Sequence, residues 1–323
     1  MKNNRIDYID KLKGIAIIFM VIGHVMQISL GVGSVAFNKF YTSFHMPIFM
    51  FLSGLFVYKY FNEWSLVEYK RFIMIKVKRI LLPFFVVGGL FSYVFYGNIT
   101  CLLDGSFNGY WFLPALFFLM CIDVSLAFVL KNFKRSFVVD ILIRLLVWLF
   151  LIILYQYGLK YAYFRGAVYH YPFFIMGILM VKYDWLKKQV FYNSNAIAVQ
   201  LLAYLTIWVF VEKVPFGFNL LGVFSIPILF FLFDKLNSQI SIFFSLCGAY
   251  SLEIYVFHRF FLPSLLEIGT YLTTIITEFD KSQNFILFLL LSLFISIPIC
   301  VICIWMGKSI KEITLLNKII FGK

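Results

Sequence analysis

The stretch GIAIIFMVIGHVMQISLGV, residues 14–32, contains no Asp, Glu, Lys or Arg. A run of roughly 17–25 apolar residues in an α-helix crosses the hydrocarbon core of a bilayer, so this stretch predicts a membrane-spanning helix. It is longer than the apolar core of a secretory signal peptide and carries His24 near its middle. We therefore expect it to be retained as the first span and not to be cleaved at Ser34-Val35-Ala36.

The whole chain has the composition of a protein surrounded by lipid. Hydrophobic residues make up 63% of its 323 residues and charged residues 13%, against roughly 45–50% and 25% in average globular domains. The mean hydropathy is +0.93. A soluble core cannot bury so much apolar surface, so the composition excludes an ordinary soluble protein.

Further apolar runs recur along the chain and have the length of membrane spans. We expect an all-α fold, a polytopic membrane helix bundle of about ten transmembrane helices that forms a single domain over residues 1–323. The predicted spans are residues 14–32, 41–59, 80–97, 110–130, 141–157, 167–182, 190–211, 216–233, 242–265 and 284–307.

The basic residues set the expected orientation. The chain has 28 Lys and Arg and a net charge of +13. If the N-terminus is cytoplasmic and the loops alternate, most of these residues, Arg144 among them, fall on the cytoplasmic side, where such residues are enriched. The few that fall outside are Lys39, Lys160, Arg165, Lys213 and Lys281. The pattern favours both termini inside, with membrane lipid and not nucleic acid as the partner of the charge.

Ionisable side chains within spans are costly and mark candidate functional residues. Lys13 precedes His24 by about three helical turns, so the two share a helix face at roughly 16 Å separation. This spacing puts a cation at the cytoplasmic surface and a neutral imidazole, which can take a proton from a hydroxyl, deep in the membrane. Alternatively, Lys13 extends to the interface and His24 hydrogen-bonds a neighbouring helix.

Other polar residues have two interpretations each. Lys76 and Arg79 share a face and could hold phosphates, or they could serve as topology signals that contact anionic lipid. Ser53 could be a nucleophile beside a base, or Ser53-Gly54 could permit close helix approach.

The sequence has no metal or nucleotide motif, so we expect no metal, and its five cysteines are interpreted as small buried hydrophobes. The ninth run carries ionisable residues with unidentified partners: Glu253, His258 and Arg259.

Several motifs together resemble the integral-membrane acyltransferase 3 family, in particular its fucose O-acetylase-like, polysaccharide O-acyltransferase branch. They are Arg5-Ile6-Asp7-Tyr8-Ile9-Asp10-Lys11-Leu12-Lys13-Gly14 with Gly23-His24, Phe44-His45-Met46-Pro47 with Phe51-Leu52-Ser53-Gly54, Trp111-Phe112-Leu113, and Ser251-Leu252-Glu253-Ile254-Tyr255-Val256-Phe257-His258. The resemblance implies transfer of an acyl group, usually acetyl, from cytoplasmic acyl-CoA to a sugar hydroxyl of a lipid-linked or polymeric cell-surface glycan. It also implies location in a bacterial inner membrane.

The same resemblance implies roles for the candidate residues. The first signature, a basic residue eleven before a histidine, falls on Lys13 and His24. His24 would act as general base on the acceptor hydroxyl or would carry the acyl group transiently, and we favour the base. The second, Arg-x-x-Arg, falls on Lys76 and Arg79, where Lys keeps the charge but loses bidentate geometry. Lys13, Lys76 and Arg79 would thus bind acyl-CoA, the co-substrate. The residues that bind the acceptor or orient the site would be His45, Ser53, Trp111, Glu253, His258 and Arg259.

Two other classes of function explain the same spans. A transporter or flippase of a lipid-linked glycan also needs ionisable residues in the membrane, although the chain lacks the internally repeated halves that many transporters show. A structural or assembly subunit would tolerate replacement of His24 and Glu253. Binding of acyl-CoA separates these classes, and the sequence leaves open whether the protein is a homo-oligomer.

Overall fold

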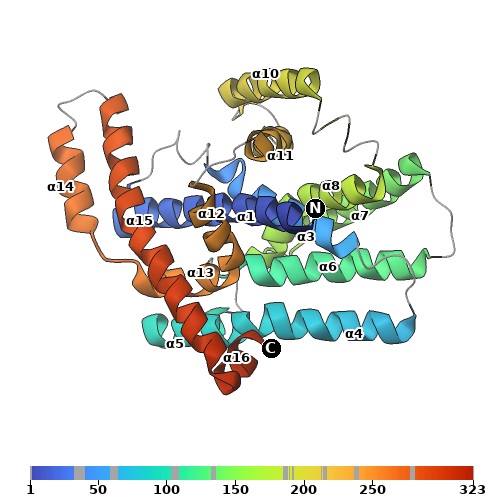
Figure 1. Ribbon diagram of the computed structural model, residues 1–323, viewed down its shortest axis with the longest axis horizontal. Coiled ribbons are helices and arrows are strands. Elements are labelled where there is room, and N and C mark those ends of the chain that lie inside the picture. The colour runs from blue at the N-terminus through green and yellow to red at the C-terminus, as the bar shows by residue number, and fades with distance from the viewer. Residues whose placement is uncertain are drawn as a thin grey trace. The chain divides into compact units, whose positions relative to one another are not determined.

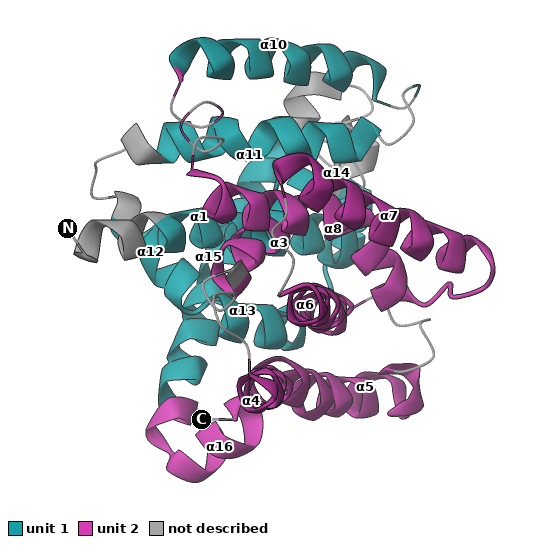
Figure 2. Ribbon diagram, turned by 90° about the vertical axis from the view of Figure 1, so that its right-hand side faces the viewer, with its two compact units in different colours: residues 1–49, 194–309 teal, residues 50–193, 310–323 magenta. Residues whose placement is uncertain are grey.

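The computed structural model describes residues 2–32, 41–58, 65–102, 109–131, 136–184, 188, 190, 193–211, 213, 217–235, 240–276 and 281–322. These residues form helices, turns and loops and no strand, which confirms the all-α expectation. The chain divides into two compact units, each assembled from separate stretches of sequence (Figure 2). Unit 1 comprises residues 1–49 and 194–309, and unit 2 comprises residues 50–193 and 310–323. The single-domain expectation stays a prediction.

Unit 1 is organised around the first helix. Its helices are α1 (Lys2–His24), the start of α3 (His45–Tyr58), α10 (Ser194–Phe210), α11 (Gly217–Lys235), α12 (Ile240–Ala249), α13 (Ser251–Phe257), α14 (Leu266–Ile276) and most of α15 (Lys281–Glu312). α1 packs along α12 and also contacts α11 and α13, while α10 lies beside α11 (Figure 1). Side chains of α1 such as Ile17 and Met20 are 0% exposed and form the core of this unit.

Glycines set the close contact between α1 and α12. A Cβ atom on Gly14 would collide with the carbonyl oxygen of Phe244, and one on Gly248 would collide with that of Asp10. Small residues let membrane helices approach until their backbones touch. The two glycines therefore fix the position of α1, the helix that carries Lys13 and His24.

Unit 2 contains the rest of α3 and the helices between it and α10. They are α4 (Leu66–Lys76), the π-helical turns η2 (Val77–Leu81) and η3 (Phe84–Gly88), α5 (Gly89–Tyr96), α6 (Phe112–Val129), α7 (Phe137–Gln156), α8 (Ala162–Lys182) and the C-terminal α16 (Thr314–Phe321). α8 packs against both α6 and α7, and α4 packs against α6. A capping box starts α4, in which the Ser65 side chain accepts from the Glu68 N–H and the Glu68 carboxylate accepts from the Ser65 N–H.

A second pair of glycines joins α3 to α8 in unit 2. A Cβ atom on Gly54 would collide with the carbonyl oxygen of Phe174, and one on Gly177 with that of Phe51. Close helix approach is therefore what Gly54 provides in the Ser53-Gly54 sequence. Ser53 itself is half-buried, and its predicted role as an acceptor-binding residue stays a prediction.

Helix lengths and surfaces agree with a membrane protein. Among the described residues, five helices are long and apolar enough to cross a bilayer: Ile9–Ser29, Phe112–Val129, Phe137–Gln156, Ala162–Lys182 and Ile286–Glu312. On α7, apolar side chains such as Leu146 (65% exposed) and Phe150 (58% exposed) stand outside any protein core, as lipid-facing residues do. Shorter apolar helices cover His45–Val57, Ser194–Phe210 and Gly217–Phe233.

The predicted ninth span differs most from the structure. Instead of one helix over residues 242–265, the chain forms α12, then α13, then a 3₁₀ turn, η5, at His258–Phe261. The third predicted span, residues 80–97, is likewise divided among η2, η3 and α5. The count of ten spans and the cytoplasmic location of both termini stay predictions.

Candidate functional site

The first signature lies on one unbroken helix. α1 runs from Lys2 to His24, so Lys13 and His24 are separated by a rise of about 16 Å at 1.5 Å per residue. Directly after His24 the helix widens into the π-helical turn η1, Val25–Ser29. Such turns are rare and frequently occur at functional sites. His24 therefore stands at the end of the regular helix, where the backbone geometry changes.

His24 contacts a histidine from the other end of unit 1. Its Nδ1 lies 2.8 Å from Nε2 of His258, and the two rings stack with centroids 5.0 Å apart and planes inclined by 19°. His258 is 0% exposed, whereas His24 is only part-buried. One nitrogen of His24 is thus engaged by a fully buried partner, while His24 as a whole residue is only part-buried.

The other three histidines hydrogen-bond within their own segments. In each, the Nδ1–H donates to a backbone carbonyl about one helical turn earlier. The acceptors are Tyr41 at 2.5 Å from His45, Gly166 at 2.8 Å from His170, and Tyr255 at 2.8 Å and Ile254 at 3.0 Å from His258. All four histidines lie in the described part of the chain, and His24 alone among them directs Nδ1 to another element.

Further predicted residues gather around this pair in unit 1. The buried His45 and the half-buried Arg259 both act electrostatically on the His24 ring. Tyr41 packs its ring 4.8 Å from that of His45 and accepts a 2.7 Å hydrogen bond from Gln27. The structure therefore brings together His24, His45, His258 and Arg259.

Glu253 lies in α13, the helix directly before the turn that carries His258 and Arg259. It is 3% exposed and stands in the first turn of α13. Gly307 of α15 makes room for it, because a Cβ atom there would come 2.6 Å from the Glu253 Cγ. The carboxylate side chain is therefore packed against the last long helix of the chain.

Lys13 has a local ionic partner. Its Nζ lies 3.2 Å from Oδ1 of Asp10, one turn earlier on α1, and the side chains are 25% and 21% exposed. A part-exposed pair of this kind is worth little in stability. The pairing keeps the Lys13 ammonium beside α1 and partly balances its charge.

The second signature lies in unit 2. α4 ends at Lys76, and η2 carries the exposed Arg79. The Lys76 ammonium sits 5.1 Å from the centre of the Phe72 ring, where a cation is attracted by the ring face. Burial, and secondarily the neighbouring Arg79 charge, lowers the pKa of Lys76 from its ordinary value. The two cations act on one another, as their shared-face spacing predicts.

Trp111 packs within unit 2. It occupies the N-cap position of α6 without a side-chain capping bond. The centroid of its ring lies 5.2 Å from that of His170, and Gly166 of α8 makes room for it. Its predicted part in acceptor binding stays a prediction.

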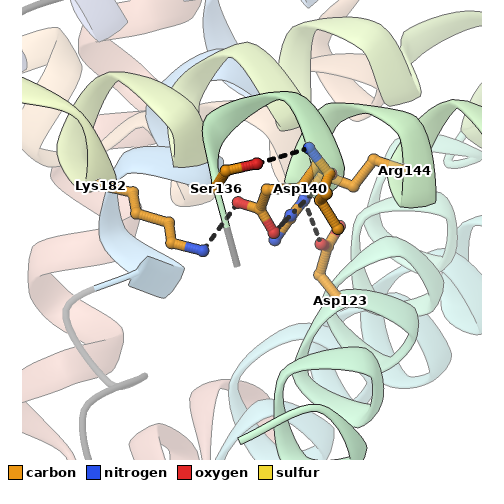
Figure 3. Close-up of polar contacts among 6 residues, drawn as sticks. Asp123, Ser136, Asp140, Arg144 and Lys182 are labelled. Atoms are coloured by element: carbon orange, nitrogen blue, oxygen red, sulfur yellow. Dashed lines mark hydrogen bonds and ion pairs between the residues drawn. The ribbon is translucent and has the colours of Figure 1, made fainter. Parts of the chain in front are cut away.

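A buried ionic cluster joins three helices of unit 2, and the sequence analysis did not identify it (Figure 3). Arg144 Nε donates to Asp123 Oδ1 at 3.1 Å, and Arg144 Nη1 donates to Asp140 Oδ1 at 2.6 Å. Lys182 donates to the second oxygen of Asp140 at 2.8 Å. The Asp123, Asp140 and Arg144 side chains are at most 3% exposed. The cluster links α6, α7 and α8 with two charges of each sign.

Arg144 differs from the other cations counted for the orientation. It lies within α7 and pairs with two buried carboxylates, and its place on the cytoplasmic side stays a prediction. The spacing of Asp140 and Arg144, four residues apart in an apolar run, is the sequence signal that indicates an ion pair on one helix face. Asp123 stands out as an ionisable residue inside the apolar run 110–130, but nothing local in the sequence pairs it with Arg144 or indicates Lys182 as a further member.

Comparison with known families gives the class of protein. A family model described as an acyltransferase domain matches residues 6–305, nearly the whole chain. The chain belongs to the acyltransferase 3 family. Its activity as a membrane acyltransferase follows from this membership and agrees with the long apolar helices. No curated protein and no solved structure matches the chain.

The family match extends over both units of this acyltransferase. It begins within α1 and ends within α15, so it includes Lys13 and His24, Lys76 and Arg79, and the segment that carries His258. The resemblance seen in the sequence is thus confirmed at the level of the family. Its branch and the roles of the individual residues belong to the proposal below.

Proposed function

We propose that this acyltransferase moves an acetyl group from cytoplasmic acyl-CoA to a sugar hydroxyl of a cell-envelope glycan, with His24 as general base. The observation that carries the proposal is the geometry of His24, a part-buried residue at the end of α1 whose Nδ1 is engaged by His258 at 2.8 Å. An oriented neutral imidazole with one ring nitrogen left for proton transfer is suited to general base catalysis. The enzyme would lie in a bacterial inner membrane with about ten spans and both termini in the cytoplasm.

The reaction needs one proton carrier. The imidazole of His24 takes the proton of the sugar hydroxyl as its oxygen attacks the thioester carbonyl carbon, and a C–O bond forms. The tetrahedral intermediate then collapses, the C–S bond breaks, and the leaving thiolate takes the proton from His24 to give free CoA. A positioned base of this kind contributes about 10²–10⁴-fold to the rate.

The basic side chains of Lys13, Lys76 and Arg79 would bind the donor, acyl-CoA. CoA carries several phosphates, and charge-assisted bonds from Lys and Arg are the strong interactions of such groups. Lys76 and Arg79, which influence one another electrostatically, and Lys13, which is held beside α1 by Asp10, would supply them from the cytoplasmic side. The thioester would then extend along the length that separates Lys13 from His24.

The acceptor is a lipid-linked or polymeric cell-surface glycan, as expected for the fucose O-acetylase-like branch. Polar side chains bind sugars through hydrogen bonds to the sugar hydroxyls, and aromatic side chains bind them by stacking on the sugar ring. The candidates are His45, Ser53, Trp111, Glu253, His258 and Arg259. Of these, His45, His258 and Arg259 lie around His24 in unit 1. This supports a place for His45 and Arg259 beside the reacting hydroxyl, whereas His258, which is 0% exposed, is placed to orient the site.

The test is acetyl transfer by purified protein in lipid nanodiscs, with radiolabelled acetyl-CoA and envelope glycan extract. In His24→Asn the amide nitrogen lies near the place of Nδ1, so the bond to His258 is kept while the second ring nitrogen is lost. We expect transfer to fall at least about 100-fold. The matched control is His170→Asn, which keeps the bond to the Gly166 carbonyl and should retain activity. Near-normal transfer by His24→Asn would refute the base.

The same samples distinguish the other classes of function. Release of free CoA that depends on glycan supports the enzyme. Movement of glycan across liposomes without consumption of acyl-CoA would instead establish a transporter. Failure of the protein to bind acyl-CoA, together with wild-type glycan modification by the His24→Asn strain, would leave an assembly role.

A further inference from the structure

The hydrogen-bond pattern of His258 fixes where its own proton lies. Its Nδ1 contacts two backbone carbonyl oxygens, of Tyr255 at 2.8 Å and Ile254 at 3.0 Å. A carbonyl oxygen can only accept, so Nδ1 must carry the hydrogen. The side chain is 0% exposed and is followed directly by Arg259. A second proton on this ring would create a buried cation beside another cation, which is costly. His258 is therefore neutral, and its Nε2 carries a lone pair.

That lone pair determines the tautomer of His24. The Nε2 of His258 lies 2.8 Å from Nδ1 of His24, so the His24 nitrogen must be the donor. A neutral imidazole has only one N–H. Once Nδ1 holds the hydrogen, the Nε2 of His24 is left with a lone pair, and this is the nitrogen that can take a proton.

We propose that His258 is a positioning residue that holds His24 in the tautomer with a basic Nε2. The inference rests on the proposed role of His24 as general base and deepens it. When His24 accepts the hydroxyl proton at Nε2, its Nδ1–H remains bonded to His258, so the charged intermediate needs no rearrangement of hydrogen bonds. The chain of contacts runs from the carbonyls of α13 through His258 to His24. The other groups that face His24 electrostatically are His45 and Arg259.

Two substitutions at His258 separate this role from simple packing. In His258→Gln, the side-chain carbonyl oxygen lies near the place of Nε2 and can accept from His24. In His258→Asn, the amide nitrogen lies near the place of Nδ1, so the bonds to Tyr255 and Ile254 are kept and the acceptor for His24 is lost. Both variants are polar and smaller than His258, so they serve as controls for one another.

The first measurement does not depend on acyl transfer. Imidazole ¹⁵N spectra of histidine-labelled protein in nanodiscs report which ring nitrogen carries hydrogen, and the His24 signals are assigned by their loss in His24→Asn. We expect Nδ1–H for His24 in the wild type and in His258→Gln, and a mixture of tautomers in His258→Asn. A wild-type His24 with its hydrogen on Nε2, or a His258→Asn spectrum unchanged at His24, would overturn the proposal.

The second measurement is the kinetics of acetyl transfer. For His258→Asn we expect kcat to fall at least tenfold with little change in KM for acetyl-CoA, while His258→Gln keeps most of the activity. Equal loss in both variants would point to packing and overturn the positioning role. If the spectra agree with the expectation but His24→Asn remains active, the base assignment fails and the hydrogen-bond order stands, so the two failures are distinguishable.

Discussion

Replacement of Arg144 by methionine tests the buried ionic cluster. Arg144 holds Asp123 at 3.1 Å and Asp140 at 2.6 Å, and all three side chains are at most 3% exposed. Hydrogen bonds to charged groups contribute about 1.5–3 kcal/mol each, and removal of one partner from a buried pair costs about 3–5 kcal/mol. Asp140 keeps Lys182 as its partner, but Asp123 does not keep its arginine. We expect Arg144→Met to lower the free energy of unfolding by about 3–5 kcal/mol.

The chain offers a matched control for this change. Lys188 and Asp184 form an ion pair with the same four-residue spacing and a 3.1 Å separation, but their side chains are 75% and 69% exposed. Surface pairs contribute about 0–1 kcal/mol. Lys188→Met should therefore cost less than about 1 kcal/mol, because water and salt replace the lost partner.

The assay is the apparent melting temperature in one detergent at one heating rate, since unfolding of such proteins is often irreversible. At roughly 2–4 °C per kcal/mol, Arg144→Met should melt at least about 6 °C lower than the wild type. A double variant, Asp123→Asn with Arg144→Met, keeps the cluster neutral and should recover part of the loss, because uncompensated charge is the main penalty. Equal shifts for Arg144→Met and Lys188→Met would show that the buried cluster stabilises the fold no more than an exposed ion pair.

Two further predictions concern acyl-CoA binding and helix packing. The pKa of Lys76 is lowered by burial, so it loses its charge at lower pH than an ordinary lysine. The KM for acyl-CoA should therefore rise with increasing pH in the wild type, whereas Lys76→Arg, which stays charged, should show no such rise; identical pH profiles would contradict a phosphate-binding role. Gly248→Ala should reduce folded yield or melting temperature because its Cβ would collide with the backbone of Asp10, whereas Gly89→Ala, which has nothing within 4 Å, should be neutral or stabilising. Equal effects of the two glycine changes would contradict the close contact of α1 and α12.

The periodic and compositional features of the fold could be predicted from sequence. Apolar runs predict helices in lipid because each backbone group must be satisfied within the segment, and every described part of those runs is mainly helical. The division of the ninth predicted span, residues 242–265, into α12, α13 and η5 had no such signal in the sequence. No proline lies between Gly248 and His258, so the change from α12 to α13 to a 3₁₀ turn comes from packing.

The individual residues of the candidate site could be predicted from the sequence, but the contacts between them could not. Each histidine stood out because an ionisable group in an apolar run is costly. The contact of His24 with His258 joins positions 234 residues apart, and spacing carries no information about which helices pack together. The ionic partners of Arg144 were unpredictable for a related reason: a count of cations by position does not show which of them pair with buried carboxylates.

Both signatures adjoin a π-helical turn, which explains why helical spacing alone could not give the site geometry. η1 follows His24 and η2 follows Lys76, and in η1 the Leu30 N–H bonds to the carbonyl of Val25, five residues back. Such a turn rotates everything after it relative to the preceding α-helix. No proline or glycine in Val25–Ser29 imposes it.

The surroundings of η1 connect it to the segment that carries His258. Val25 and Met26 are 0% and 1% exposed, and the Ser29 carbonyl accepts a 3.0 Å hydrogen bond from the Leu265 N–H, in the segment after His258. The chain that carries His258 is thus tied to the turn that follows His24. The π-helical turn and the contact between the two imidazoles therefore lie side by side, where α1 meets the segment of His258.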